Sequence, residues 1–513
     1  MRARARLESR YRRLAPPTRS LLLALLLSGC VVAPSVLVGL IDHLSPEIRV
    51  RPHELPPSHL LMLLEAEQGE DSWGPMSAAL TRLRTEPDRP LYPSLFFEEG
   101  TKFQYPLSSL LALEALEIGL ERLGLDPRAD LAGALNASSW LAFVALVLVS
   151  AAIFERSRRH VVPAPDPDPD RAIRYALLLA AGLTFYPAMR AYSLGQIQTW
   201  INLAFALTLW CWIGDRRSTA GALVGLVCLI KPQFGVLVLW GLLRRQWRFA
   251  AVSLLVVGAG TALACHRYGI ANNLGYLEVL SHIAKRGETY YPNQSFNGLL
   301  NRLLMNGDNL RWAPSSFPPY DVRIHALTFA TSASLLAASL LPPADPTRRA
   351  HVSDLLVVAV TATLASPVAW EHHYGVLLPI YALVLPVLLS PARARRGPLA
   401  LLCASYLLTG SYLYAAKKTA DVAWLNPLQS YLFAGALMLL LLLYRWRAGK
   451  IADPPGAHAQ AGGGTAPGLG ASRPGTPGPG SISRARQNAP TSMFGQVLSV
   501  PGKSRWPQTV APG

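Results

Sequence analysis

The feature that most constrains this chain is a succession of apolar segments separated by short loops that contain arginine. Crossing a bilayer takes roughly 17–25 predominantly apolar residues, and many of these segments approach that length. Hydrophobic residues make up 51% of the 513 residues and charged residues only 15%, whereas a soluble globular protein is about a quarter charged. The sequence therefore predicts an all-α polytopic membrane protein with about twelve transmembrane helices.

The predicted spans alternate with basic loops, which sets their direction. Residues 106–125 also look helical, but Glu114, Glu117 and Glu121 share one face, which favours a helix at the interface over a span. If residues 106–125 do not cross the membrane, the arginine-rich loops all fall on one side and both termini are cytoplasmic. If they do cross it, the basic loops downstream lie outside. The predicted spans are residues 20–42, 131–154, 173–190, 199–213, 218–230, 233–243, 249–265, 322–341, 352–366, 374–390, 398–415 and 427–446.

The sequence divides the chain into three parts. Residues 1–19 form a basic cytoplasmic N-terminus, and residues 20–446 form the transmembrane domain, with a first exterior loop at 43–105 and a second at 266–321. Residues 447–513 are rich in Gly, Pro, Ala, Ser and Arg, and we expect a disordered cytoplasmic tail. A signal peptide ending near Cys30 is the alternative for the first apolar run, but that run continues to Ile41 and favours a span.

Charge and cysteine content exclude two classes of protein. The formal net charge is +17, but the basic residues lie in short loops, where they act as topology signals, so no nucleic-acid partner is predicted. The cysteines follow neither metal nor redox spacing and read as small buried hydrophobic residues. They are Cys30, Cys211, Cys228, Cys265 and Cys403.

Four polar clusters interrupt the apolar pattern, and the same topology puts all of them at the exterior face. They are residues 193–200, 231–233, 293–297 and 366–374. Polar groups at that depth are costly unless they are used or paired. We therefore predict a bundle of helices that holds these clusters around one site.

The ordered set of short motifs resembles glycosyltransferase family 87 from about residue 20 to residue 445. Glu371 stands where that family usually has Asp before two histidines, and Leu107 stands where it often has a second proline. The motifs are Leu91-Tyr92, Phe103-x-Tyr105-Pro106-Leu107, Leu194-Gly195-Gln196, Lys231-Pro232-Gln233, Asn293-Gln294-Ser295 and Ser366-Pro367-x-x-Trp370-Glu371-His372-His373, all after an acid in the first exterior loop.

The resemblance implies a membrane enzyme with a GT-C-type helical bundle. Such enzymes take a hexose, mostly mannose, from a polyprenyl phosphate. A β-linked donor then gives an α-glycoside by inversion at an exterior acceptor, which we expect to be a glycolipid or polysaccharide at the plasma membrane. The expected partners are this donor, the acceptor and membrane lipids, and no cofactor is expected.

Asp71 is the predicted catalytic base, because the family places its acid in the first exterior loop and Asp71 before Ser72-Trp73 matches best. A carboxylate at a membrane face can be desolvated, which raises its proton affinity toward what a base needs. Glu98 and Glu99 are competing carboxylates in the same loop. A solvated loop acid or helix cap remains the alternative.

A leaving phosphate needs positive charge, and Lys231 and Arg190 are the candidate cations. His372 and His373 are predicted to contact the phosphate rather than a metal. Adjacent helical residues point about 100° apart, and no second cluster completes a metal site. Snorkelling of Lys231 to the face and an interfacial histidine pair without chemistry are the alternatives.

The remaining predicted contacts are with the sugar or the acceptor. Amide side chains suit sugar hydroxyls, which need paired donors and acceptors, although hydrogen bonds between helices explain them equally well. Aromatic rings suit a sugar face but are also common at membrane interfaces. The predicted residues are Gln196, Gln233, Gln294, Tyr105, Trp370 and Glu371.

Two other classes of function stay open. A transporter or lipid flippase suits the number of spans, but it predicts interrupted helices at mid-membrane and an internal repeat, and we find no repeat between the halves. A membrane scaffold would retain its function without Asp71. Gly462-Gly463-Gly464 follows no strand and precedes no helix, so it is not a nucleotide-binding loop.

Overall fold

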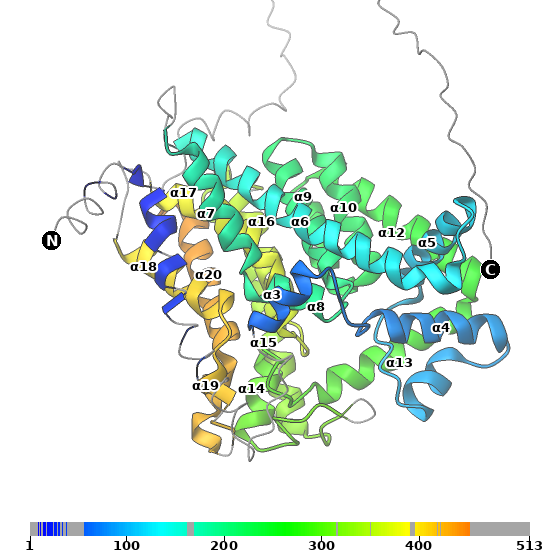
Figure 1. Cartoon of the computed structure of the whole chain (residues 1–513). Coiled ribbons are helices and arrows are strands. Elements are labelled where there is room, and N and C mark those ends of the chain that lie inside the picture. The colour runs from blue at the N-terminus through cyan, green and yellow to red at the C-terminus, as the bar shows by residue number, and fades with distance from the viewer. Residues whose placement is uncertain are drawn as a thin grey trace, which may run out of the picture. The chain divides into compact units, whose positions relative to one another are not determined.

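The computed structural model describes scattered residues between 9 and 37 and then residues 56–161, 169–313, 317–348, 350–389, 396–417, 419–420 and 422–451. Every regular element within these ranges is a helix (Figure 1). An isolated antiparallel bridge joins Asn293 to Trp370. The predicted all-α class is confirmed for this part of the chain. The span at 20–42 and the tail lie largely outside it.

The helices follow one another with short connections. The α-helices are α3 (Pro56–Leu64), α4 (Trp73–Thr85), α5 (Leu110–Arg122), α6 (Pro127–Val161), α7 (Arg171–Leu183), α8 (Tyr186–Ser193), α9 (Gln198–Ile213), α10 (Arg217–Ile230), α11 (Gly235–Leu243), α12 (Trp247–Tyr268), α13 (Ile270–Arg286), α14 (Phe296–Leu303), α15 (Val322–Leu340), α16 (Val352–Leu364), α17 (Leu377–Leu388), α18 (Arg396–Gly410), α19 (Tyr414–Lys417) and α20 (Tyr431–Arg447). Shorter turns are the π-helix η2 (Pro93–Glu98) and the 3₁₀ helices η3 (Leu107–Ser109), η4 (Pro232–Phe234), η5 (Pro346–Arg348), η6 (Glu371–Val376) and η7 (Ala423–Ser430).

Local sequence explains several helix boundaries. α10 ends at Ile230 because Pro232 disfavours helical geometry at the residue before it, and Lys231 is extended there, with φ −130° and ψ 90°. α14 begins where the Ser295 side chain accepts a hydrogen bond from the backbone N–H of Gly298. The end of the predicted span 218–230 agrees with that of α10, and Lys231 is turned out of the helical register.

The predicted spans from residue 131 onward overlap helices, but the predicted number of about twelve spans is not confirmed. Four helical stretches are long and apolar enough to cross a membrane, at residues 127–161, 247–268, 371–388 and 423–447. α7 and α8 form a fifth candidate, broken by a 54° bend. The reason is length: α11 has only 9 residues and α16 only 13, and a helix rises about 1.5 Å per residue against a core about 30 Å thick.

The two predicted exterior loops contain more helix than the sequence suggested. The first includes α3 and α4, and the second includes α13 and α14. Apolar side chains from both loops belong to one buried cluster, in which Met76 and Phe103 of the first loop accompany Tyr276 and Val279 of the second. Burial of this shared apolar surface stabilises both segments, so they form a folded layer rather than free loops.

Residues 106–125 fold as η3 followed by α5, which is not among the candidate spans. The expected acidic face is present. Glu117 pairs with Arg84 of α4 at 2.5 Å, and Glu114 pairs with Arg267 of α12 at 3.1 Å. These ion pairs attach α5 to neighbouring helices, and whether the segment crosses the membrane stays a prediction.

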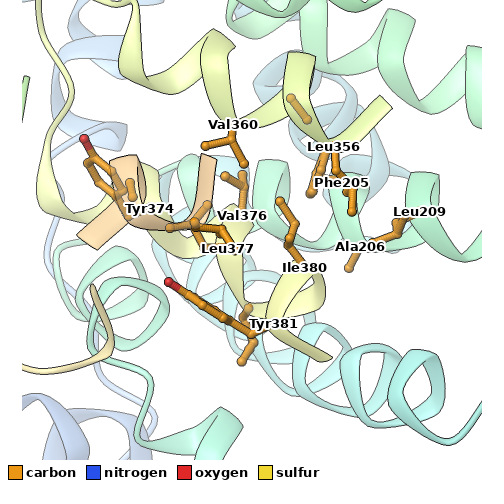
Figure 2. Close-up of a cluster of buried hydrophobic side chains, with 14 of the residues drawn as sticks. Phe205, Ala206, Leu209, Leu356, Val360, Tyr374, Val376, Leu377, Ile380 and Tyr381 are labelled. Atoms are coloured by element: carbon orange, nitrogen blue, oxygen red, sulfur yellow. The ribbon is translucent and has the colours of Figure 1, made fainter. Parts of the chain in front are cut away.

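The main hydrophobic core lies where α9, α16 and α17 meet. Figure 2 shows Phe205 and Leu209 of α9 beside Leu356 of α16 and Ile380 of α17. The described residues of α16 are almost all buried, whereas α12 leaves large apolar side chains such as Leu255 exposed. α16 is therefore an interior helix, and α12 presents an apolar face that suits lipid. This rigid core supports the start of α9 and the turn η6, which carry site residues.

Candidate active site

One cavity of about 1720 Å³ collects the chemistry-bearing motifs. Its walls come from residues 69–71, 99–105, 190–196, 231–233, 290–292 and 365–373, which are far apart in the sequence. Every predicted site residue except Gln294 lines it. Three of the four predicted polar clusters therefore meet at one cavity, whereas none of residues 293–297 lines it.

Backbone hydrogen bonds fix the segment that carries Asp71. The N–H of Gly69 donates to the carbonyl of Ser193 at 2.9 Å, and the N–H of Asp71 donates to that of Leu194 at 2.9 Å. Gly195 lies opposite at φ +67°, where a Cβ atom would stand 1.7 Å from the carbonyl oxygen of Gly69. Only glycine allows this approach, so the Leu-Gly-Gln motif acts as a backbone clamp on the Asp71 segment.

The Asp71 carboxylate faces the cavity and accepts a hydrogen bond on Oδ2 from Gln196 Nε2 at 2.5 Å. The Asp71 side chain is exposed, but its exposed surface adjoins the cavity. The protein around it still removes part of the hydration of the carboxylate. Burial raises the pKa of Asp71 above the usual 3.8, while the Gln196 hydrogen bond and the charge of Arg190 act in the opposite direction. A carboxyl group with a raised pKa is a better proton acceptor.

The competing carboxylates are ion-paired. Glu99 also lines the cavity but pairs with Arg82 at 2.5 Å, and Glu98 pairs with Arg89 at 2.6 Å. Both of these carboxylates are already engaged by an arginine, whereas Asp71 has no ion-pair partner among the described residues. The contacts therefore favour Asp71 as the base, as the sequence predicts.

Lys231 brings a buried ammonium group to the cavity wall. Its side chain is only 7% exposed, and Nζ donates to Gln198 Oε1 at 2.6 Å. No carboxylate among the described residues lies within ion-pairing distance of it. Burial lowers the pKa of Lys231 well below its usual value, so an anion in the cavity would stabilise the charged form.

The two histidines lie on η6, and both line the cavity. Their ring planes are at 82° with centroids 4.8 Å apart, so the two imidazoles contact each other edge to face. His372 Nε2 is buried without a hydrogen-bond partner in the described structure. Lys231 and Arg190 line the same cavity as His372, so two basic groups and an imidazole share one space suited to an anion.

The Asn293-Gln294-Ser295 motif holds the strand-like segment before η6. The N–H of Gln294 donates to the carbonyl of Ala369 at 2.7 Å, and the N–H of Glu371 donates to that of Pro292 at 3.0 Å. Ser295 Oγ donates to the carbonyl of Pro367 at 2.8 Å. This motif therefore places Trp370 and the histidines at the cavity.

Gln294 itself does not reach the cavity. Its Nε2 donates to the carbonyls of Tyr291 at 2.8 Å and Gln429 at 2.6 Å, and its Oε1 accepts from the N–H of Leu432 at 3.1 Å. The amide is fully buried and bound to backbone. Of the two roles that the sequence left open for Gln294, the contacts fit structural hydrogen bonding, because the amide joins the segment before α14 to η7 and α20.

Sequence reasoning missed two residues that support the site. His59 of α3 contacts Arg190 Nη1 and Ser193 Oγ, each at 3.0 Å. Tyr186 donates its hydroxyl to Glu371 Oε2 at 2.8 Å. A single histidine in a predicted loop and a single tyrosine in a predicted span carry no spacing signal, so only the fold reveals their roles. The described residues include no group of three His, Cys, Asp or Glu side chains that could hold a metal.

Apolar helices of membrane-crossing length, together with a cavity lined by Asp71, Lys231, Arg190 and two imidazoles, define a membrane protein with a polar cavity of ionisable groups. A family model for glycosyltransferase family 87 matches residues 103–367, more than half of the chain. The chain therefore belongs to glycosyltransferase family 87, as its motifs predict.

Curated relatives agree with this assignment. The chain is 26% identical over 224 residues to a polyprenol-phosphate-mannose-dependent alpha-(1-2)-phosphatidylinositol pentamannoside mannosyltransferase of Mycobacterium tuberculosis, covering 43% of this chain and 47% of that protein. It is 29% identical over 251 residues to a polyprenol-phosphate-mannose-dependent alpha-(1-2)-phosphatidylinositol mannoside mannosyltransferase of Mycolicibacterium smegmatis, covering 47% and 52%. The chain thus spans about half the length of these relatives. No solved structure matches it significantly.

Proposed function

We propose that this protein is an inverting mannosyltransferase that takes mannose from a polyprenyl phosphate. The single observation that carries the proposal is one cavity that combines Asp71, a carboxylate without an ion-pair partner among the described residues, with the buried ammonium of Lys231 and the unpartnered Nε2 of His372. Glycosyl transfer from a lipid phosphate needs two parts, a general base and an anion-binding site.

The reaction follows from these positions. Asp71 takes the proton of the acceptor hydroxyl as its oxygen attacks the anomeric carbon of mannose. The bond between that carbon and the phosphate oxygen breaks, and its electron pair leaves with the polyprenyl phosphate. Lys231, Arg190 and the histidines stabilise the charge that develops on the phosphate. Attack opposite the leaving group inverts the anomeric centre.

For the acceptor we propose a phosphatidylinositol mannoside or a closely similar anionic glycolipid. The relatives act on this kind of acceptor by name. The cavity is far larger than one sugar phosphate, and its wall also includes the basic residues Lys102, Arg311 and Lys417. Lys102 lies 5.1 Å from the centre of the Trp312 ring and pairs with Glu288 at 3.2 Å. Positive charge and an indole ring suit a phosphate beside sugars.

We further propose that the cavity opens at the exterior face of the plasma membrane with both termini in the cytoplasm. The arginine loops support this orientation, because basic residues favour the cytoplasmic side. Gln196, Gln233, Tyr105 and Trp370 line the same cavity, and Gln233, Tyr105 and Trp370 remain our candidates for contacts near the sugar or acceptor.

The test is a transfer assay on purified protein in detergent, with radiolabelled polyprenyl-phosphate mannose and a phosphatidylinositol mannoside. We expect wild-type protein to form a new glycolipid and Asp71→Asn to lower kcat by a factor of about 10² to 10⁴, the usual contribution of a general base. Glu99→Gln is the matched control, because it neutralises a carboxylate on the same wall that is paired with Arg82. Equal turnover by wild type and Asp71→Asn would remove the base assignment.

The same preparation decides between transfer and transport. Reconstituted in liposomes, a flippase would move polyprenyl-phosphate mannose across the bilayer and leave the acceptor unmodified. We expect a new glycosidic bond instead. Movement of the lipid without any glycolipid product would replace the enzyme proposal with the transporter.

A further inference from the structure

A four-residue hydrogen-bond network surrounds the Asp71 carboxylate, and its centre is Gln196. Gln196 is 6% exposed. Its Oε1 accepts from Ser72 Oγ at 2.8 Å and from Tyr105 OH at 3.3 Å, while its Nε2 donates to Asp71 Oδ2 at 2.5 Å. The Ser72 and Tyr105 hydroxyl oxygens are themselves 2.8 Å apart.

The direction of these bonds follows from counting protons. The N–H of Ile197 donates to Ser72 Oγ at 3.1 Å, and the Ser72 hydroxyl donates its own proton to Gln196 Oε1. A hydroxyl has one proton to donate, and an amide nitrogen donates but does not accept. Rotating the amide by 180° would place its oxygen against the Asp71 carboxylate, where two acceptors repel. The NH₂ group of Gln196 therefore has to face Asp71.

We propose that Gln196 is the positioning residue of the catalytic base, holding Asp71 by Oδ2 so that Oδ1 alone takes the proton of the acceptor hydroxyl. No described residue donates a hydrogen bond to Oδ1, and Asp71 opens onto the cavity. This inference rests on the proposed mannosyltransferase function. It gives Gln196 a role different from the sugar contact that its motif suggested.

The network also sets the protonation of the base. Burial favours the neutral acid, whereas the hydrogen bond from Gln196 favours the carboxylate, which keeps the pKa of Asp71 lower than burial alone would make it. Hydrogen bonds to charged groups are roughly twice as strong as neutral ones. Loss of the donor should therefore move the acid limb of the rate profile to higher pH.

Other ionisable groups also face this space, and they must stay constant for the comparison to be meaningful. Arg190 of α8 acts directly on Asp71, and Asp71 acts on Tyr105. The remaining neighbours on the cavity wall are the acids Glu70, Glu99 and Glu371, the imidazoles His372 and His373, and the cations Lys102, Lys231, Arg311 and Lys417. A substitution at residue 196 leaves all of them in place.

The experiment compares the pH dependence of kcat for wild type and Gln196→Met in the mannosyl-transfer assay with saturating donor. Methionine has nearly the same length but no donor for Asp71. We expect the midpoint of the acid limb to rise by about one pH unit, since one pKa unit corresponds to the strength of a moderate hydrogen bond. The rate on the plateau should fall by about tenfold or more because the carboxylate is no longer held.

Gln233→Met is the matched control, because Gln233 lines the same cavity but does not contact Asp71. Its acid limb should coincide with that of wild type, whatever its effect on rate. If Gln196→Met does not accumulate as folded protein, Gln196→Glu replaces it. That variant keeps the acceptor for Ser72 and Tyr105 but sets a second carboxyl group against Asp71, so its limb should rise further.

The outcomes separate the two proposals. A wild-type protein that forms no mannosylated product refutes the mannosyltransferase proposal itself. If wild type transfers mannose and the acid limbs of Gln196→Met and Gln196→Glu coincide with that of wild type, the positioning role is refuted. The mannosyltransferase proposal is then unaffected. An upward shift in Gln233→Met equal to that in Gln196→Met would also refute it, since the shift would then not depend on the bond to Asp71.

Discussion

The clamp between Gly195 and Gly69 offers the sharpest test of how the backbone places the base. Gly195 has φ +67°, and a Cβ atom there would stand 1.7 Å from the Gly69 carbonyl oxygen, where real Cβ contacts are essentially never under 3.0 Å. Gly195→Ala therefore has to separate the two segments by at least about 1.3 Å. The movement falls on the segment that leads directly into Asp71.

The cost can be assembled from the contacts. Left-handed backbone costs alanine about 1 kcal/mol or slightly more. Separating the segments also breaks the bonds from the N–H of Asp71 to Leu194 and from the N–H of Ser72 to Gly195, each worth about 1 kcal/mol net. We expect about 3 kcal/mol of local destabilisation. A displacement of about 1 Å at a reacting group lowers a rate by about 100-fold.

The assay measures kcat for mannosyl transfer together with thermal unfolding by circular dichroism in detergent. We expect Gly195→Ala to lose about 100-fold in kcat while remaining helical. Gly258→Ala is the control, because a Cβ atom on Gly258 of α12 would meet no neighbouring atom within 4 Å, and alanine is a better helix former. Wild-type kcat in Gly195→Ala would refute the clamp and the placement of Asp71 that depends on it.

Three further predictions follow from individual contacts. Lys231→Met should lower kcat by about 10²- to 10³-fold. It should not lower the unfolding temperature, since it removes a buried ammonium with no ion-pair partner among the described residues. Unchanged turnover would exclude a role of Lys231 in phosphate stabilisation. The wild-type rate should fall as pH drops through the pKa of Asp71, and because burial raises that pKa, the fall should occur at higher pH than for an ordinary carboxyl group of pKa 3.8; a rate that stays level down to that pH would contradict an Asp71 base. Gln294→Leu should cost about 3 kcal/mol of unfolding free energy, because three backbone groups lose their partners, with the KM for donor unchanged in the folded fraction; a raised KM at normal stability would instead support sugar binding.

The sequence by itself determined where most helices lie and which motifs carry chemistry. Apolar runs locate helices because burial or lipid contact demands them, and Pro232 ends α10 for a steric reason that is local. The order of the motifs also identified the family, which the match over residues 103–367 confirms. Helix runs and helix ends are readable because each depends on neighbouring residues alone, and each family motif is a short local string whose order along the chain can be read directly.

Tertiary structure decided the rest. An amide that binds a sugar and one that ties two helices together look the same in a sequence, so the buried position of Gln294 emerged only from the fold. The contact between Gln196 and Asp71 joins residues 125 positions apart, and no local pattern specifies it. Likewise, α11 and α16 are apolar but too short to count as membrane-length helices. Composition marks a helix as buried, but it does not say whether lipid or protein surrounds that helix.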